Sequence, residues 1–129
     1  MGIPITAFYA GLLGLIYLVL GFHVGSYRGK AGVSILHGDD MELATRIRRH
    51  GNFAEYVPLL LVLFAALELG GAASWSLHAM GAALVGARIA HPLGLFHDTI
   101  GHPLRVVGAV GTLLVLLFAS IMAIVQFFD

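Results

Sequence analysis

The chain has 129 residues, of which 59% are hydrophobic and 11% charged, and its formal net charge at pH 7 is zero. A soluble domain of this length could not bury so much apolar surface, so the composition predicts a membrane protein with a single domain, residues 1–129. The zero net charge gives no support for nucleic-acid binding, and the absence of cysteine excludes a structural disulfide, a thiolate metal site and a protein thiol nucleophile.

Four segments are long and apolar enough to cross a bilayer, which takes roughly 20 residues. We expect these spans at residues 4–27, 43–69, 77–95 and 104–128. The first has no Asp, Glu, Lys or Arg and carries Gly21-x-x-x-Gly25, a spacing that lets helix backbones approach closely. The second is polar at its start and apolar from Val57 onward. Four spans with short connections predict an all-α membrane protein built as a four-helix bundle.

The basic residues are confined to two of the three connections. All seven lie in or beside the first or the third connection: Arg28, Lys30, Arg46, Arg48, Arg49, Arg88 and Arg105. In a protein with four spans, these two connections emerge on the same side of the membrane. The positive-inside rule therefore predicts that both basic connections face the cytoplasm and that both termini face the other side.

A stripe of polar residues enters the second span. Its members follow one another at i, i+4, i+7 and i+8, the spacing of one helix face: Arg48, Asn52, Glu55 and Tyr56. Pro58 follows inside the span, where the loss of one backbone donor tends to bend a helix. Ionisable groups inside a membrane domain usually face a cavity, a ligand or one another.

Two further spans contribute polar residues at the same side. Arg88 and His91 share a face of the third span, and Arg105 lies in the first turn of the fourth. A cation gains nothing from the helix dipole at that position, so we expect an anionic group near Arg105.

Pairing within the protein is the simpler interpretation of these charges. It would join Arg48 to Glu55 and Arg88 to a carbonyl. The carboxylates near the basic residues are five in number: Asp39, Asp40, Glu42, Glu55 and Asp98. Two of the seven cations would remain unpaired even if all five took part. The set as a whole therefore indicates a site for a small anion.

Three motifs carry a family resemblance. Residues 48–58, RRHGNFAEYVP, closely resemble the Arg-x-x-x-Asn-x-x-Glu-Tyr-x-Pro signature of the MAPEG superfamily, the membrane-associated proteins in eicosanoid and glutathione metabolism. Residues 86–96, GARIAHPLGLF, resemble the family segment that contains Arg-x-x-His, and residues 102–105, HPLR, resemble the Pro-x-Arg that opens the fourth helix. The superfamily includes microsomal glutathione transferases and the leukotriene and prostaglandin E synthases. HGDDMEL, residues 37–43, is more similar to the small bacterial branch.

The resemblance implies a homotrimer that binds glutathione between subunits at the cytoplasmic side of a bacterial inner membrane. The matching positions for glutathione binding are Arg28, Arg48, Asn52, Glu55, Tyr56, Arg88 and His91. Arginines suit the two carboxylates of glutathione, and Glu55 suits its ammonium group. Arg105 would be the catalytic residue, because a guanidinium beside the thiol lowers the thiol pKa while remaining charged itself. The implied activity is that of a glutathione-dependent transferase or peroxidase acting on hydrophobic electrophiles or lipid hydroperoxides dissolved in the membrane.

Two other interpretations remain open. The chain carries Leu95, Val106 and Ala109 where the synthases carry polar side chains, which is compatible with a non-catalytic protein that binds glutathione or an anionic lipid head group. In the lipid case the outer arginines, Arg28 and Arg49, would matter most. Histidines near the basic side could also bind haem or a metal. However, no two of them are spaced as His-x-x-x-His on one helix, so we predict no metal site.

Overall fold

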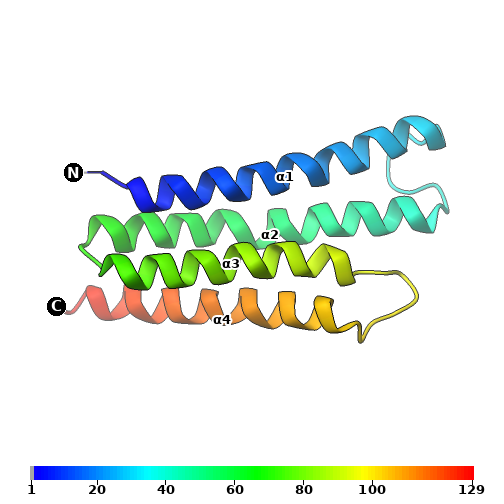
Figure 1. The fold of residues 1–129 in the computed structure, drawn as a ribbon. Coiled ribbons are helices and arrows are strands. Elements are labelled where there is room, and N and C mark those ends of the chain that lie inside the picture. Colours follow the sequence, from blue (N-terminus) through cyan, green and yellow to red (C-terminus); the bar gives the residue numbers. More distant parts are fainter. Residues whose placement is uncertain (1) are drawn as a thin grey trace.

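The computed structural model describes residues 2–129 and consists of four helices joined by short connections (Figure 1). The helices are α1 (Pro4–Ala31), α2 (Met41–Leu69), α3 (Ser74–Gly94) and α4 (Pro103–Gln126). They run side by side and alternate in direction (Figure 1). The predicted all-α four-helix architecture is confirmed, and each helix begins and ends within four residues of the expected span.

The third helix differs from the other three in composition. Helices α1, α2 and α4 are long and apolar enough to cross a bilayer by themselves, whereas α3 does not meet that standard. Its polar residues Ser76, Arg88 and His91 are buried within the bundle. With 21 residues, α3 is about 30 Å long, which matches the hydrocarbon thickness of a bilayer. Its length is therefore sufficient to cross the hydrocarbon core, but the expectation that all four segments are apolar enough to do so is wrong for α3.

The bundle is built from two hairpins. The most extensive contact is between α3 and α4, and the next is between α1 and α2; α1 also packs on α3, and α2 on α4, whereas α1 and α4 lie diagonally without contact in the described chain. The hydrophobic core draws residues from all four helices, among them Leu13, Phe64, Leu84 and Val115. The opposite face of α4 stays uncovered in the protomer, where large apolar side chains are exposed.

The closest backbone approach lies between α3 and α4 and depends on glycine. A Cβ atom added to Gly108 would lie 2.5 Å from the backbone nitrogen of His91, and one added to Gly94 would overlap the backbone nitrogen of Arg105. Any side chain at these positions would push the two helices apart. These glycines therefore set the distance between the end of α3 and the start of α4.

The glycines singled out from the sequence have a different environment. A Cβ atom on Gly25 would meet nothing within 4 Å, and one on Gly21 would meet only the His50 ring, at 3.8 Å. The expectation that Gly21 and Gly25 bring helix backbones together is therefore wrong within the protomer. In α3, by contrast, Gly81 packs directly against the ring of Tyr9.

The first hairpin is tied at the end where the chain begins. Helix α1 has no side-chain cap of its own at its N-terminus. Glu68, in the last turn of α2, supplies one: its Oε1 accepts a hydrogen bond from the backbone N–H of Ile5 (2.8 Å) and its Oε2 accepts one from Thr6 (2.7 Å). A carboxylate is favourable there because the first amides of a helix lack partners and carry a partial positive charge.

The connection between α1 and α2 ends at a capping aspartate. Asp40 Oδ1 accepts a hydrogen bond from the Leu43 backbone N–H (3.0 Å), and the Tyr27 hydroxyl donates to Oδ2 (3.1 Å). The bond from Leu43 is the largest cause that holds the pKa of the Asp40 carboxyl below its ordinary value of 3.8, and the bond from Tyr27 adds to it. Asp40 thus joins the end of α1 to the start of α2.

We expect Asp40→Asn to lower the melting temperature at pH 7 and to have less effect in acid. The folded-state pKa is lower than the unfolded one, so the carboxylate stabilises the fold above about pH 4 and loses this contribution as the pH falls through the folded-state pKa. Thermal unfolding in detergent across a pH series measures the gap between the two proteins. A gap that stayed constant down to the lowest pH would contradict the assignment. Asp39→Asn is the matched control, because Asp39 has a left-handed backbone (φ 65°) that asparagine also adopts.

Candidate functional site

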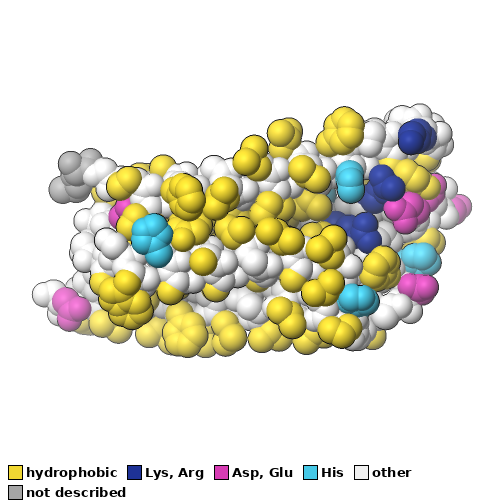
Figure 2. All heavy atoms as spheres, viewed as in Figure 1, with side chains coloured by type: hydrophobic (Ala, Val, Ile, Leu, Met, Phe, Trp, Pro, Cys, Tyr) yellow, Lys and Arg dark blue, Asp and Glu magenta, His cyan; other side chains and the backbone are white. Residues whose placement is uncertain are grey.

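The basic residues gather at one end of the bundle. This basic end is where α1 and α3 finish and where α2 and α4 begin (Figure 1). Figure 2 shows Lys and Arg side chains at this end only, whereas the remaining length of the visible face is mostly apolar. The prediction that both basic connections share one side of the bundle is therefore confirmed.

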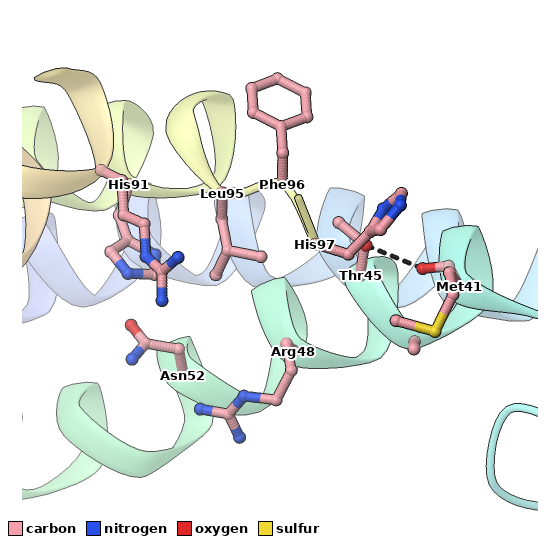
Figure 3. A pocket seen from close by; sticks show the side chains of 10 residues that line it. Met41, Thr45, Arg48, Asn52, His91, Leu95, Phe96 and His97 are labelled. Atoms are coloured by element: carbon pink, nitrogen blue, oxygen red, sulfur yellow. Dashed lines mark hydrogen bonds between the residues drawn. The ribbon is translucent and has the colours of Figure 1, made fainter. Parts of the chain in front are cut away.

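A cavity of about 300 Å³ opens at the basic end, between α2, the end of α3 and the start of α4. It brings together four of the eight residues predicted for the site: Arg48, Asn52, His91 and Arg105. Figure 3 shows Arg48 and Asn52 on α2 facing His91 and Leu95 across the cavity. The arrangement places guanidinium, amide and imidazole groups around one space, which suits a small ligand with carboxylate and peptide groups.

The two arginines of the cavity differ in their electrostatic partners. Arg48 forms a two-pronged ion pair with Glu55, with Nη1–Oε1 at 2.9 Å and Nη2–Oε2 at 3.2 Å. The pairing interpretation is thus correct for Arg48, although both side chains are more than half exposed and such a pair is readily exchanged. Within residues 2–129, Arg105 has no carboxylate at ion-pair distance. The cavity therefore carries an uncompensated positive charge at the start of α4.

Arg88 lies behind the cavity and is completely buried. Its Nη1 donates a 2.8 Å hydrogen bond to Asn52 Oδ1, the carbonyl oxygen of a side-chain amide, which confirms the expected pairing with a carbonyl. The same Nη1 makes a longer contact, of 3.5 Å, with Thr112 Oγ1. Its Nε and Nη2 have no hydrogen-bond partner in the described chain, and the same holds for Nδ1 of His91. Burying a cation without a counter-charge destabilises the fold, so we infer that Arg88 serves the site rather than stability. It fixes the amide of Asn52, which faces the cavity.

Four predicted residues lie outside this cavity in the protomer: Arg28, Glu55, Tyr56 and Arg88. Arg28 Nη1 donates to the carbonyl oxygens of Val33 (3.1 Å) and Leu36 (2.8 Å) and so holds its own connection in place. Tyr56 packs against the hydrophobic core. Direct contact of these residues with a ligand remains a prediction.

Part of the cavity wall was not predicted from the sequence. Met41 and Thr45 line it, together with Phe96 and His97 of the third connection; Leu95, which was noted from the sequence, lines it as well. A signal for the first two was present, because they extend the stripe of Arg48 and Asn52 at helical spacing toward the start of α2. No comparable signal exists for the residues of the connection.

Comparison with known proteins extends over nearly the whole bundle. The chain matches the model of the MAPEG family over residues 6–125. It is 36% identical to the inner membrane protein YecN of Escherichia coli (strain K12) over 93 residues, which is 72% of this chain and 71% of that protein. YecN of Escherichia coli O6:H1 matches to the same extent. No solved structure gives a significant match. The family match runs from the first turns of α1 almost to the end of α4 and includes every helix of the cavity.

Proposed function

This chain belongs to the MAPEG family, and on that premise we propose that it is a glutathione-dependent transferase or peroxidase of the bacterial inner membrane. The family includes glutathione transferases, and the relative in Escherichia coli is an inner membrane protein. The observation that carries the proposal is the position of Arg105, a cation without a carboxylate partner in residues 2–129, beside His91 and Asn52 in a cavity of about 300 Å³. Such a site suits an anion that forms during a reaction.

The thiolate of glutathione is that anion in our proposal. A free thiol with a pKa near 8.5 is only a few per cent ionised at pH 7, and a neighbouring guanidinium lowers the pKa and raises the thiolate fraction. Arginine does not deprotonate in proteins, so Arg105 would stabilise the thiolate and would not act as a base. Arg48 would exchange Glu55 for a carboxylate of glutathione, which leaves Glu55 for the ammonium group.

A second copy of the chain would complete the site. A volume of about 300 Å³ is at the lower limit for ligand pockets, and glutathione is a tripeptide. Arg28 and Tyr56 lie outside the cavity of their own protomer, and the exposed apolar face of α4 offers a contact surface within the membrane. We therefore propose a homotrimer with glutathione between subunits. The basic end would face the cytoplasm, and the hydrophobic second substrate would enter from the lipid.

Arg105→Ala tests this function directly. We expect the variant to bind glutathione within about tenfold of the wild-type affinity, because the other contacts remain. It should lose the ultraviolet thiolate band at pH 7, and its conjugation rate should fall roughly 100-fold or more. Glutathione is titrated onto the detergent-purified protein while the thiolate band is recorded, and electrophile conjugation and hydroperoxide reduction are then assayed.

Arg46→Ala serves as the matched control, because Arg46 pairs with Glu42 on the surface of α2 and does not line the cavity. It should leave the thiolate band unchanged. Binding without a thiolate band in the wild type would favour a non-catalytic glutathione-binding protein. No binding at all would contradict the proposed function and leave the fold unaffected.

A further inference from the structure

A second cavity, of about 260 Å³, lies between α1 and α3 and is separate from the cavity that contains Arg105. Its walls are apolar along most of their length: Ile16, Val19, Leu20, Ile89, Pro92 and Leu93. Val19, Ile89 and Leu93 are 48% to 59% exposed, so the cavity is a groove that opens sideways to the surrounding lipid. A groove of this kind suits a hydrocarbon chain.

One end of the groove is charged. Arg49 reaches it from α2, and His23 lies beside it on α1. Both Nε (3.1 Å) and Nη2 (2.8 Å) of Arg49 donate to the carbonyl oxygen of Leu95, which holds the guanidinium between the helices. Within residues 2–129, Arg49 has no carboxylate at ion-pair distance, and its Nη1 takes part in no hydrogen bond. The groove therefore combines an apolar length with one available cation.

The depth of this cation matches the position of a phosphate. Leu95 directly follows α3, whose 21 residues cover about 30 Å, the thickness of the hydrocarbon core. When the bundle is placed with α3 across the hydrocarbon core, Arg49, which binds the Leu95 carbonyl, comes to the boundary between hydrocarbon and head groups. From His23 to Ile16 the groove extends about 10 Å along α1 into the hydrocarbon region.

We propose that this groove binds one acyl chain of an anionic membrane phospholipid, with the phosphate paired to Arg49. Guanidinium and phosphate make charge-assisted hydrogen bonds, and His23 supplies a second polar group at the same level. A zwitterionic lipid brings its own cation, which competes with Arg49 for the phosphate. The proposal is independent of glutathione chemistry and assigns the groove a ligand of its own.

Lipid binding to the full-length protein tests this site. The protein is purified in a mild detergent and titrated with phosphatidylglycerol or with phosphatidylcholine of the same chain length, and bound lipid is counted by native mass spectrometry. We expect phosphatidylglycerol to bind about tenfold more tightly. Arg49→Gln should abolish this preference, while its amide can still donate to the Leu95 carbonyl. Lys30→Gln, in the last turn of α1 and outside the groove, should retain it.

A second pair of variants tests the apolar part of the groove. Ile89→Trp fills it from an exposed position and should lower the binding of both lipids, whereas Val62→Trp, at an exposed position of α2 outside the groove, should not. Equal affinity for both lipids in the wild type would overturn the proposal, and so would phosphatidylglycerol binding unchanged in Arg49→Gln or Ile89→Trp. Preferential binding of oleate would also overturn it and would assign the groove to a fatty acid. Melting temperatures confirm that each variant is folded.

Discussion

Gly108→Ala is expected to lower the free energy of unfolding by about 3 kcal/mol or more, although alanine is the better helix former. The added methyl group would lie 2.5 to 2.6 Å from the backbone and Cβ atoms of His91. No side-chain rotation relieves a clash with backbone, so α4 must move away from α3. The same movement carries Arg105 away from His91, and we therefore expect glutathione binding to weaken together with stability.

Gly86→Ala is the matched control for this prediction. Gly86 lies in α3, and a Cβ atom there would meet nothing within 4 Å. We expect this variant to be as stable as the wild type or more stable by up to about 1 kcal/mol, because alanine favours the helix. Both variants are compared by reversible unfolding in detergent. If Gly108→Ala and Gly86→Ala behaved alike, the close approach of α3 and α4 would be disproved.

Arg88→Met is expected to raise the free energy of unfolding by about 1 to 3 kcal/mol and to weaken glutathione binding. The wild-type guanidinium is fully buried, has no counter-charge in the described chain and leaves two nitrogen atoms without partners there. Methionine fills a similar volume without a charge. The substitution also removes the hydrogen bond from Arg88 to Asn52, so the Asn52 amide would no longer be fixed toward the cavity.

The free energy of unfolding and the affinity for glutathione are measured on the same preparation, and we expect the first to rise while the second falls. Lys30→Met, at an exposed position in the last turn of α1, should change stability by less than about 0.5 kcal/mol and leave binding unchanged. A strongly destabilised Arg88→Met would show that the free nitrogens of Arg88 find acceptors in the assembled membrane protein. If Arg88→Met were more stable and bound glutathione as tightly as the wild type, Arg88 would have no role in the proposed site.

The helices and half of the site were predictable because both depend on short-range patterns. Hydropathy located the helices, and the spacing of Arg48 and Asn52 placed both side chains on one face of α2. The meeting of His91 with Arg105 was also expected, but only through the family resemblance. In physical terms it depends on Gly108, one of 17 glycines, and nothing in the local sequence distinguishes it from the others.

Arg28 illustrates what a sequence pattern cannot supply. Its guanidinium binds the connection that follows α1, and in that connection Leu36 has a φ of 56° and Asp39 a φ of 65°. Such conformations are rare for residues other than glycine, so the path of this connection could not be anticipated. The complete burial of Arg88 beside Asn52 and Thr112 could not be anticipated either, because helical spacing fixes which face a residue occupies and does not fix its partners.

Glu68 links the order of synthesis to the order of assembly. Within the described chain, the backbone amides of Ile5 and Thr6 at the start of α1 find their acceptor at the far end of α2. Glu68 must therefore be synthesised, and must reach the side of the membrane where α1 begins, before the backbone N–H groups of Ile5 and Thr6 have their hydrogen-bond acceptor. From that moment the N-terminal hairpin can close as a unit, before α3 has been translated. Membrane insertion of this protein thus has a natural halfway point, at which two helices are complete and the other two are still to come.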